Sequence, residues 1–357
     1  MYAAMTTDEG NEADGRVSVA CVFWRTGMIA FLVRRLILAL LTVWAVSILA
    51  YVVIQLPPGD YITSYIAQMS ASGSAVSEQE AKMLREQYGL DQPIYVQYIR
   101  WMSMVLRGNF GMAMEYGRPV AEVIGDRLWL TMIVSGAAIL FTWLVALPIG
   151  VYSAVRQYSF GDYVATFIGF IGLAVPSFML ALILMYLGFK YFNTSIGGLF
   201  SDQFAEAPWS LAKIWDLMKH LPLPAVVLGL AGTAQLIRIM RANLLDELGR
   251  PYVMTARARG LSEGRLIMKY PVRVALNPFA STIGYLLPYV VSGSIIVSLV
   301  LSLPTVGPLL LKALVAQDMF LAGTIVLMLG VMTVIGTFLS DLLLLWIDPR
   351  IRFEGKQ

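Results

Sequence analysis

The sequence has one cysteine, Cys21, and one histidine, His220, among 357 residues. A single cysteine excludes an internal disulfide framework and leaves too few thiols for a metal site built on thiolates alone. A single histidine leaves little for metal binding through imidazole or for histidine-dependent catalysis. Charged residues are scarce as well, at 14% against the roughly 25% of soluble domains. The apolar fraction of 58% and the mean hydropathy of +0.71 therefore indicate a membrane protein with several spans.

Motifs for nucleotide and metal chemistry are also missing. No segment matches G-x-x-x-x-G-K-[ST], so the chain does not hydrolyse nucleotide by that route. H-E-x-x-H is absent, and no nucleophile assisted by histidine is evident near a span. The net charge of +3 is small, and in a membrane protein the location of the basic residues says more than their sum. We therefore expect no catalytic residue, no metal site, no cofactor bound by this chain and no nucleic-acid partner.

Long apolar runs predict an all-α membrane protein with about six transmembrane helices, since each helix needs roughly 20 apolar residues. A large polar region follows the first run at 57–127, and a second polar excursion occupies 190–220. Within the first region, Ser77 and Glu80 have the spacing of a capping box and predict a short helix to Tyr88. The six runs are 36–56, 128–155, 163–189, 222–239, 279–301 and 320–347.

Residues 1–27 are polar and mixed in charge, and we interpret them as a disordered tail. The apolar run 17–24 is too short to span a membrane and lacks the order of a secretory signal. Met28, directly before the first long apolar run, is a candidate for the true start, so the membrane domain is predicted over 28–357.

Basic residues indicate the orientation, because short cytoplasmic loops carry an excess of lysine and arginine. Arg34 and Arg35 precede the first span, Arg156 follows the second, and eight Lys or Arg lie between 238 and 273. With six spans these positions fall on one face. Both termini are therefore predicted to be cytoplasmic, and 57–127 to be extracytoplasmic.

The spans are nearly free of ionisable residues, whereas secondary transporters keep such residues at mid-membrane for coupling ions. Arg238 and Asp341 are the main exceptions. Pro148 and Pro176 either kink their helices and open a translocation path, or are tolerated because neighbouring helices satisfy the freed backbone groups. The small-residue clusters Gly169-Gly172 and Ala225-Gly229-Gly232 favour close helix packing.

A basic loop at 242–275 separates the fourth and fifth spans. Pro251 suits the first position of a helix, and Gly260 suits a left-handed residue after a helix end. Ser262 is a candidate N-cap for a second helix, Glu263 would meet its positive end, and Lys269 and Pro271 would close it. The loop is thus predicted to hold two short helices with a sharp bend. Helices this short need packing to be stable, which is typical of a docking element.

The loop segment YVMTARARG at 252–260, with Leu261 after it and Asn277-Pro278 further on, resembles the coupling loop of ABC importer permeases of the dipeptide and oligopeptide group. Shorter similarities extend over 28–357. They are Pro58-Gly59-Asp60, LREQYGLDQPIYVQY at 84–98, Arg107-Gly108-Asn109-Phe110-Gly111, Ser-Gly-Ser-Ile-Ile-Val at 292–297, and 348–352.

The resemblance implies a type I importer permease in a bacterial cytoplasmic membrane. It implies a second, similar permease, two ABC ATPases that bind ATP and Mg, and an extracytoplasmic binding protein, with alternating access as the mechanism. It assigns ATPase coupling to Ala256, Arg257, Ala258, Arg259, Gly260, Leu261 and Ser262. Gly260 would set the bend, the alanines keep the helix surface low, the arginines pair with acidic groups, and Leu261 would be an apolar anchor.

Peptide and oligosaccharide remain alternatives for the solute. Pro304-Thr305-Val306-Gly307 and Ser298 depart from the pattern of the peptide group, and the 190–220 excursion is long, as in members that carry oligosaccharides. A secondary transporter or channel that works alone is the competing function. A membrane enzyme is the third, for which the sequence offers no nucleophile or metal cluster.

Overall fold

The computed structural model describes residues 33–56, 59–71, 77–192, 197–277, 279 and 295–347. Four helices in this part of the chain are long and apolar enough to cross a membrane, which confirms the predicted all-α membrane class. They are Val33–Gln55, α5 (Val120–Val155), α10 (Pro222–Leu248) and α16 (Met319–Ile347). They match four of the expected runs, and α5 and α10 are longer than predicted. The expected run 279–301 lies mostly outside the described residues.

The expected third span is not one helix. It is divided into α6 (Phe160–Ala174) and α7 (Ser177–Phe192), which meet at an angle of 103°. Pro176 has no backbone N–H and disfavours helical geometry at Val175, which is extended with φ −85° and ψ 121°. The interpretation of Pro176 as a tolerated helix proline is therefore wrong. Pro148, by contrast, lies inside the continuous α5. With the bent pair counted as one span, the described residues hold up to five.

The polar region after the first span forms a small module. It contains α2 (Tyr61–Ala71), α3 (Glu78–Tyr88), α4 (Ile94–Leu106) and an antiparallel pair, β1 (Met112–Ala113) and β2 (Arg118–Pro119). The predicted cap is confirmed, since Ser77 Oγ accepts the Glu80 N–H at 3.1 Å. Asp318, fully buried just before α16, accepts the Met114 N–H at 2.6 Å and so ties the module to that span.

The helices pack closely where the small-residue clusters predicted. A Cβ on Gly229 of α10 would come within 2.9 Å of the Ala138 carbonyl oxygen of α5, and one on Gly172 of α6 within 3.1 Å of Leu230. At the other side, Arg35 Nη2 of the first span donates to Asp341 Oδ1 of α16 at 2.6 Å. This ion pair places the start of the first span beside the end of α16.

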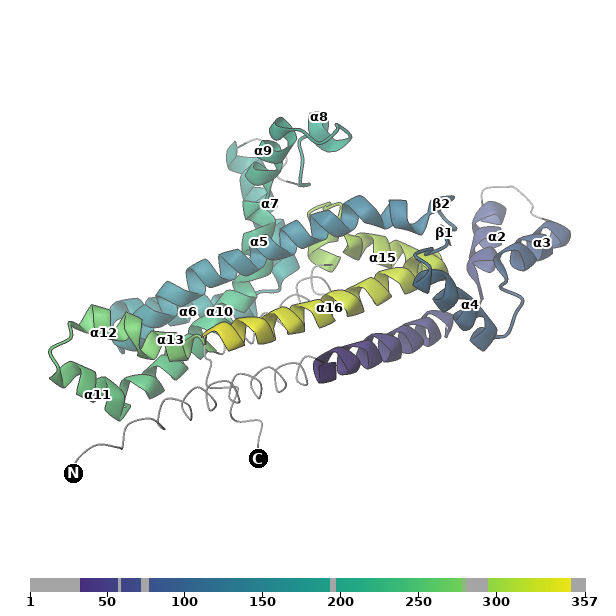
Figure 1. The fold of residues 1–357 in the computed structure, drawn as a ribbon. Helices are drawn as coiled ribbons and strands as arrows, with labels where there is room; N and C mark the ends of the chain where they lie inside the picture. Colours follow the sequence, from purple (N-terminus) through teal and green to yellow (C-terminus); the bar gives the residue numbers. More distant parts are fainter. Residues whose placement is uncertain are drawn as a thin grey trace, which may run out of the picture.

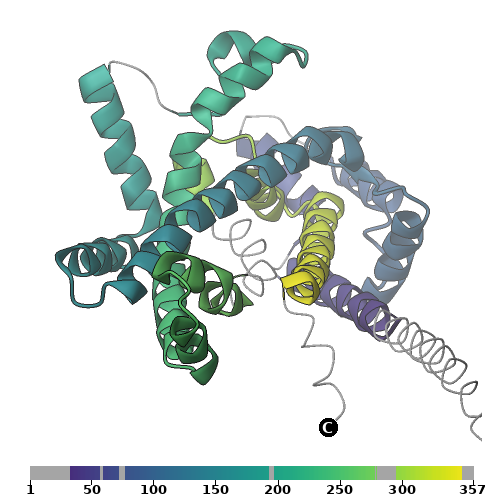
Figure 2. The same cartoon turned by 60° about the vertical axis from the view of Figure 1, so that its left-hand side comes forward.

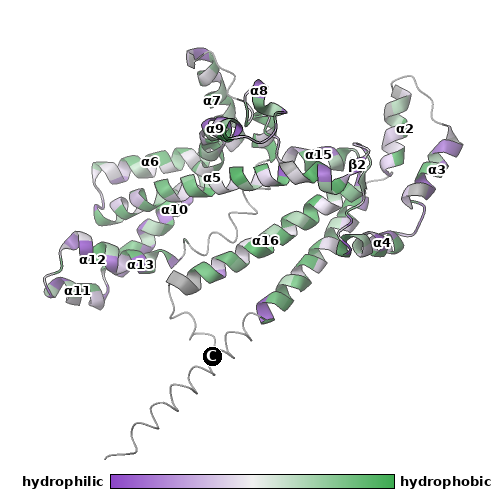
Figure 3. Ribbon diagram, turned by 45° about the horizontal axis from the view of Figure 1, so that its top comes forward, coloured by the Kyte–Doolittle hydropathy of each residue, from purple (hydrophilic) through white to green (hydrophobic). Residues whose placement is uncertain are grey.

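The remaining described helices occupy opposite ends of the molecule. Figure 1 shows α2–α4 with the strand pair at one end, and α11 (Pro251–Ala258), α12 (Glu263–Lys269) and α13 (Pro271–Ala275) at the other. Helix α15 (Val306–Val315) lies beside α16, while α8 (Asp202–Ala205) and α9 (Leu211–His220) lie on the same flank of the bundle as α7 (Figure 1). Figure 2 shows α7 projecting sideways from the bundle. Hydropathy colouring separates the apolar spans from the more polar α3 and α11–α12 (Figure 3).

Candidate functional site

The basic loop folds as two helices and a bend, as the sequence predicts. Pro251 opens α11, and Gly260 has a φ of +78° directly after the helix end at Arg259. Only glycine takes this left-handed conformation without strain from a Cβ atom. Helix α12 then ends at Lys269, and Pro271 begins α13. The chain therefore reverses within four residues, Arg259 to Ser262.

The outer side of the bend is open. Gly260 is exposed, and a Cβ built on it would meet no atom of the other described residues within 4 Å, its two chain neighbours apart. Its lack of a side chain is therefore explained by backbone conformation and not by crowding within this chain. A flat, exposed glycine at the end of the molecule leaves room for another surface to approach the backbone closely.

An ion pair braces the bend. Arg257 Nε donates to Glu263 Oε1 at 2.5 Å and Arg257 Nη2 to Glu263 Oε2 at 3.1 Å, so the guanidinium holds the carboxylate with two bonds. The bond to Arg257 lowers the pKa of Glu263, and the same bond raises the pKa of Arg257. The predicted side-chain cap by Ser262 is wrong, because Ser262 occupies the N-cap position but its hydroxyl makes no capping bond.

The inner side of the loop packs on α10. Val253 and Ala256 of α11 and Leu266 and Ile267 of α12 belong to one buried cluster with Leu244 of α10. Ala256, expected on the docking surface, is therefore turned inward. Leu261 is half-buried against the same cluster, so it anchors the bend to its own chain. Arg257, Ala258, Arg259, Gly260 and Ser262 form the outward part of the predicted set.

Two exposed methionines flank this outward set. Met254 of α11 and Met268 of α12 are about 60% exposed (63% and 60%), beside buried Val253 and Ile267. Methionine is flexible and polarisable, and it is common at surfaces that bind a partner. Neither methionine was among the predicted coupling residues. Their apolar character at positions between buried neighbours on such short helices was the available signal.

A second ion pair lies on the same side of the molecule, between α10 and α6. Arg241 Nε and Nη2 donate to the two carboxylate oxygens of Asp162 at 3.2 and 3.1 Å. Asp162 is almost fully buried and also accepts the Tyr158 N–H at 3.0 Å. The charge pair fixes the start of α6 to the helix that carries the basic loop.

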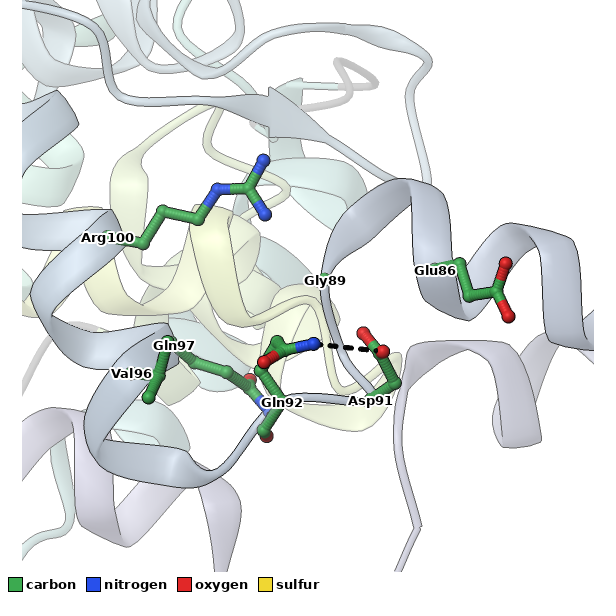
Figure 4. Close-up of a pocket in the computed structure, with 7 residues that line it drawn as sticks. All are labelled: Glu86, Gly89, Asp91, Gln92, Val96, Gln97 and Arg100. Carbon is green, nitrogen blue, oxygen red and sulfur yellow. Dashed lines mark hydrogen bonds between the residues drawn. The ribbon is translucent and has the colours of Figure 1, made fainter.

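Metal ligands and cavities are the remaining candidates for a functional site. Within the described residues, no group of three His, Cys, Asp or Glu side chains could hold a metal ion. A cavity of about 270 Å³ lies in the polar module, between the end of α3 and the start of α4 (Figure 4). Because it lies outside the spans, it gives no path through the membrane. Its lining residues are Glu86, Gly89, Asp91, Gln92, Val96, Gln97 and Arg100.

Comparison with known proteins identifies similarity over nearly the whole chain. Residues 146–353 match the family described as binding-protein-dependent transport system inner membrane component, and residues 28–135 match its N-terminal membrane component. The oligopeptide transport system permease protein AppB of Bacillus subtilis is 33% identical, over 91% of this chain and 100% of that protein. The dipeptide transport system permease protein DppB of Escherichia coli is 30% identical, over 92% of this chain and 100% of that protein.

Proposed function

This chain belongs to the family of binding-protein-dependent transport system inner membrane components, and from that premise we propose that it carries peptides and is driven through its basic loop. The chain is a multi-pass inner-membrane permease subunit of an importer, and it is not itself an enzyme. The family match gives no support to the alternative, a secondary transporter or channel that works alone. Peptides are preferred to oligosaccharides because the relatives are named for oligopeptides and dipeptides.

The observation that carries the proposal is the exposed, braced bend at Gly260. It stands at one end of the molecule, presents backbone without side-chain cover, and belongs to a loop that shares a buried apolar cluster with α10 through Leu266 and Leu244. Because the loop packs on α10, a movement of the bound ATPase is expected to be transmitted through the loop to α10. Residues Ala256 to Ser262 are therefore proposed as the coupling segment, with Ala256 and Leu261 acting from the inner side.

The proposed assembly contains a second permease, two ABC ATPases that bind ATP and Mg, and a binding protein on the opposite face. The basic loop faces the cytoplasm in this arrangement, as its charges predict. The Arg35–Asp341 pair supports both termini on one side of the membrane, because it joins the start of the first span to the end of α16. The polar module at the opposite end of the bundle then faces the binding protein.

Reconstitution tests the transport function directly. Vesicles holding all proposed subunits are expected to accumulate short peptides only when ATP is supplied on the side of the basic loop. Vesicles holding this chain alone should show no uptake under an imposed proton or sodium gradient. Uptake by the chain alone under such a gradient would refute the importer mechanism. Calorimetry of the purified binding protein with peptides and with oligosaccharides decides the solute class separately.

Two arginines in the loop provide a matched test of docking. Arg257 is already paired with Glu263, whereas Arg259 has no acidic partner among the described residues. We expect Arg259→Gln to weaken ATPase binding by about 2 kcal/mol, the usual cost of removing one partner of an interfacial charge pair, or roughly 30-fold. Arg257→Gln should weaken it far less. Biolayer interferometry on the chain in nanodiscs measures both, and equal losses would contradict the assignment.

A further inference from the structure

Helix α9 has an inverted distribution of side chains. Lys213 and Asp216 are only 6% and 8% exposed. The apolar residues Leu211, Ile214, Trp215 and Met218 are instead exposed, by 46% to 86%. Their spacing of three, one and three residues places all four on one stripe of the helix. In contact with water this arrangement would expose apolar surface at a cost of about 25 cal/mol per Å². The stripe therefore needs an apolar neighbour.

The buried polar groups are satisfied locally, so the inversion is built into the segment. Lys213 Nζ donates to the Ala207 carbonyl at 2.6 Å and lies 4.8 Å from the centre of the Phe200 ring. Asp216 accepts the backbone N–H and the hydroxyl of Ser201, each at 2.7 Å. Because these hydrogen bonds are made within the segment, contact of the apolar stripe with a nonpolar medium would leave neither Lys213 nor Asp216 without a partner.

The position of α9 in the fold indicates which medium that is. The helix ends at His220, and the membrane-spanning α10 begins two residues later at Pro222. Leu217 belongs to the same buried cluster as Leu130 and Val134, which lie a few residues inside the charged Arg127 of α5. Helix α9 is therefore placed where the spans reach the membrane surface.

The residues at the end of α7 also indicate that this part of the chain lies at the membrane surface. Tyr186, Phe189 and Tyr191 are each more than 60% exposed, and Lys190 Nζ lies 5.6 Å from the centre of the Tyr191 ring. Aromatic rings with a lysine are typical of the boundary between acyl chains and headgroups. Helices α8 and α9 follow this end of α7 (Figure 1). On α9 itself, Lys219 is exposed at the edge of the stripe, where its ammonium group can reach lipid phosphates.

We propose that α9 is an interfacial helix whose stripe of Leu211, Ile214, Trp215 and Met218 is immersed in the outer lipid leaflet. A helix of this kind lies in the membrane plane with its apolar face among the acyl chains. It would fix the depth of the α7–α10 connection in the bilayer. This lipid contact requires neither an ATPase nor a particular solute, so it stands or falls apart from the coupling role.

Spin labels distinguish lipid, protein and water around the stripe. Leu211→Cys and Met218→Cys are made separately with Cys21→Ser, labelled, and reconstituted in vesicles of phosphatidylethanolamine and phosphatidylglycerol. Relaxation by oxygen, which partitions into lipid, is compared with relaxation by a water-soluble nickel chelate. We expect both labels to be relaxed more by oxygen than by nickel. Leu140→Cys, an exposed position on α5, gives the lipid reference, and Glu80→Cys in the polar module gives the water reference.

The result that overturns the proposal is equally specific. Strong relaxation by nickel at both stripe positions would place α9 in water. The labelled chain is measured first alone and then together with the second permease. Weak relaxation by both reagents would mean that protein covers the stripe. If it occurs only when the second permease is present, that permease is the covering protein. Both label positions are exposed, so the substitutions remove no buried side chain. Relaxation dominated by oxygen, with and without the second permease, establishes lipid contact.

Discussion

Replacing Gly260 by aspartate is expected to abolish ATP-driven uptake while leaving membrane insertion intact. The change adds a side chain and a negative charge to the exposed bend, where the proposed ATPase surface must approach the backbone. Among the described residues, no atom beyond the two chain neighbours of Gly260 lies within 4 Å of the new Cβ, so the loop itself has space for it. A protruding side chain and an unpaired charge both act against binding at an interface, and a loss of about 2 kcal/mol alone lowers binding roughly 30-fold. Peptide uptake into vesicles with all subunits measures the effect.

Gly108 supplies a control for the backbone strain. It has a φ of +75°, follows an arginine at a helix end, and also has no atom within 4 Å of its Cβ position. It lies after α4, at the opposite end of the molecule from the basic loop. Gly108→Asp therefore introduces the same strain and charge away from the ATPase, and ATPase binding by this variant should stay close to that of the unaltered chain. Normal uptake by Gly260→Asp would show that the bend is not the docking element.

The sequence predicts the location and the bend of the candidate site, but it does not predict the side-chain contacts within that site. Proline and glycine act through local backbone geometry, so Pro251 and Gly260 marked the helix start and the bend correctly. The inward position of Ala256 and the Arg257–Glu263 brace depend on how the loop packs against α10. Those contacts join residues that short-range patterns do not relate. Ser262 illustrates the difference, since the residue type suits a cap but the neighbouring geometry gives no capping bond.

Prolines show the same limit in the fold. Pro148 and Pro176 both stand inside apolar runs, yet α5 is continuous at Pro148 and the chain turns by 103° at Pro176. A helix survives a proline when its surroundings satisfy the freed carbonyl and hold the axis. Gly150 of α5, two residues after Pro148, packs against Met240 of α10, with the Cβ position only 2.6 Å from the Met240 Cβ. Hydropathy identifies apolar segments that are long enough to span the membrane, but tertiary contacts decide whether such a segment forms one continuous helix.

Asp162→Asn is expected to destabilise the membrane domain by about 3 kcal/mol, the usual cost of removing one partner from a buried ion pair. The substitution keeps the shape of the side chain and an oxygen for the Tyr158 N–H, but it leaves the Arg241 guanidinium without its counter-charge. Reversible unfolding of the purified chain in mixed micelles measures the loss. Because Arg241 belongs to α10, the same change should also loosen the link between the basic loop and α6.

Glu263→Gln is the matched control, because it makes the same kind of change in an ion pair of similar geometry whose two side chains are exposed to solvent. Exposed pairs contribute little, since water screens the charges and ordering the side chains opposes the attraction. The double variant Asp162→Asn with Arg241→Gln removes the buried carboxylate and the half-buried guanidinium, and it should recover part of the lost stability. Equal losses from Asp162→Asn and Glu263→Gln would mean that burial does not set the strength of the Asp162 pair. The attachment of α6 to α10 would then rest on apolar packing around Gly169 and Gly172 alone.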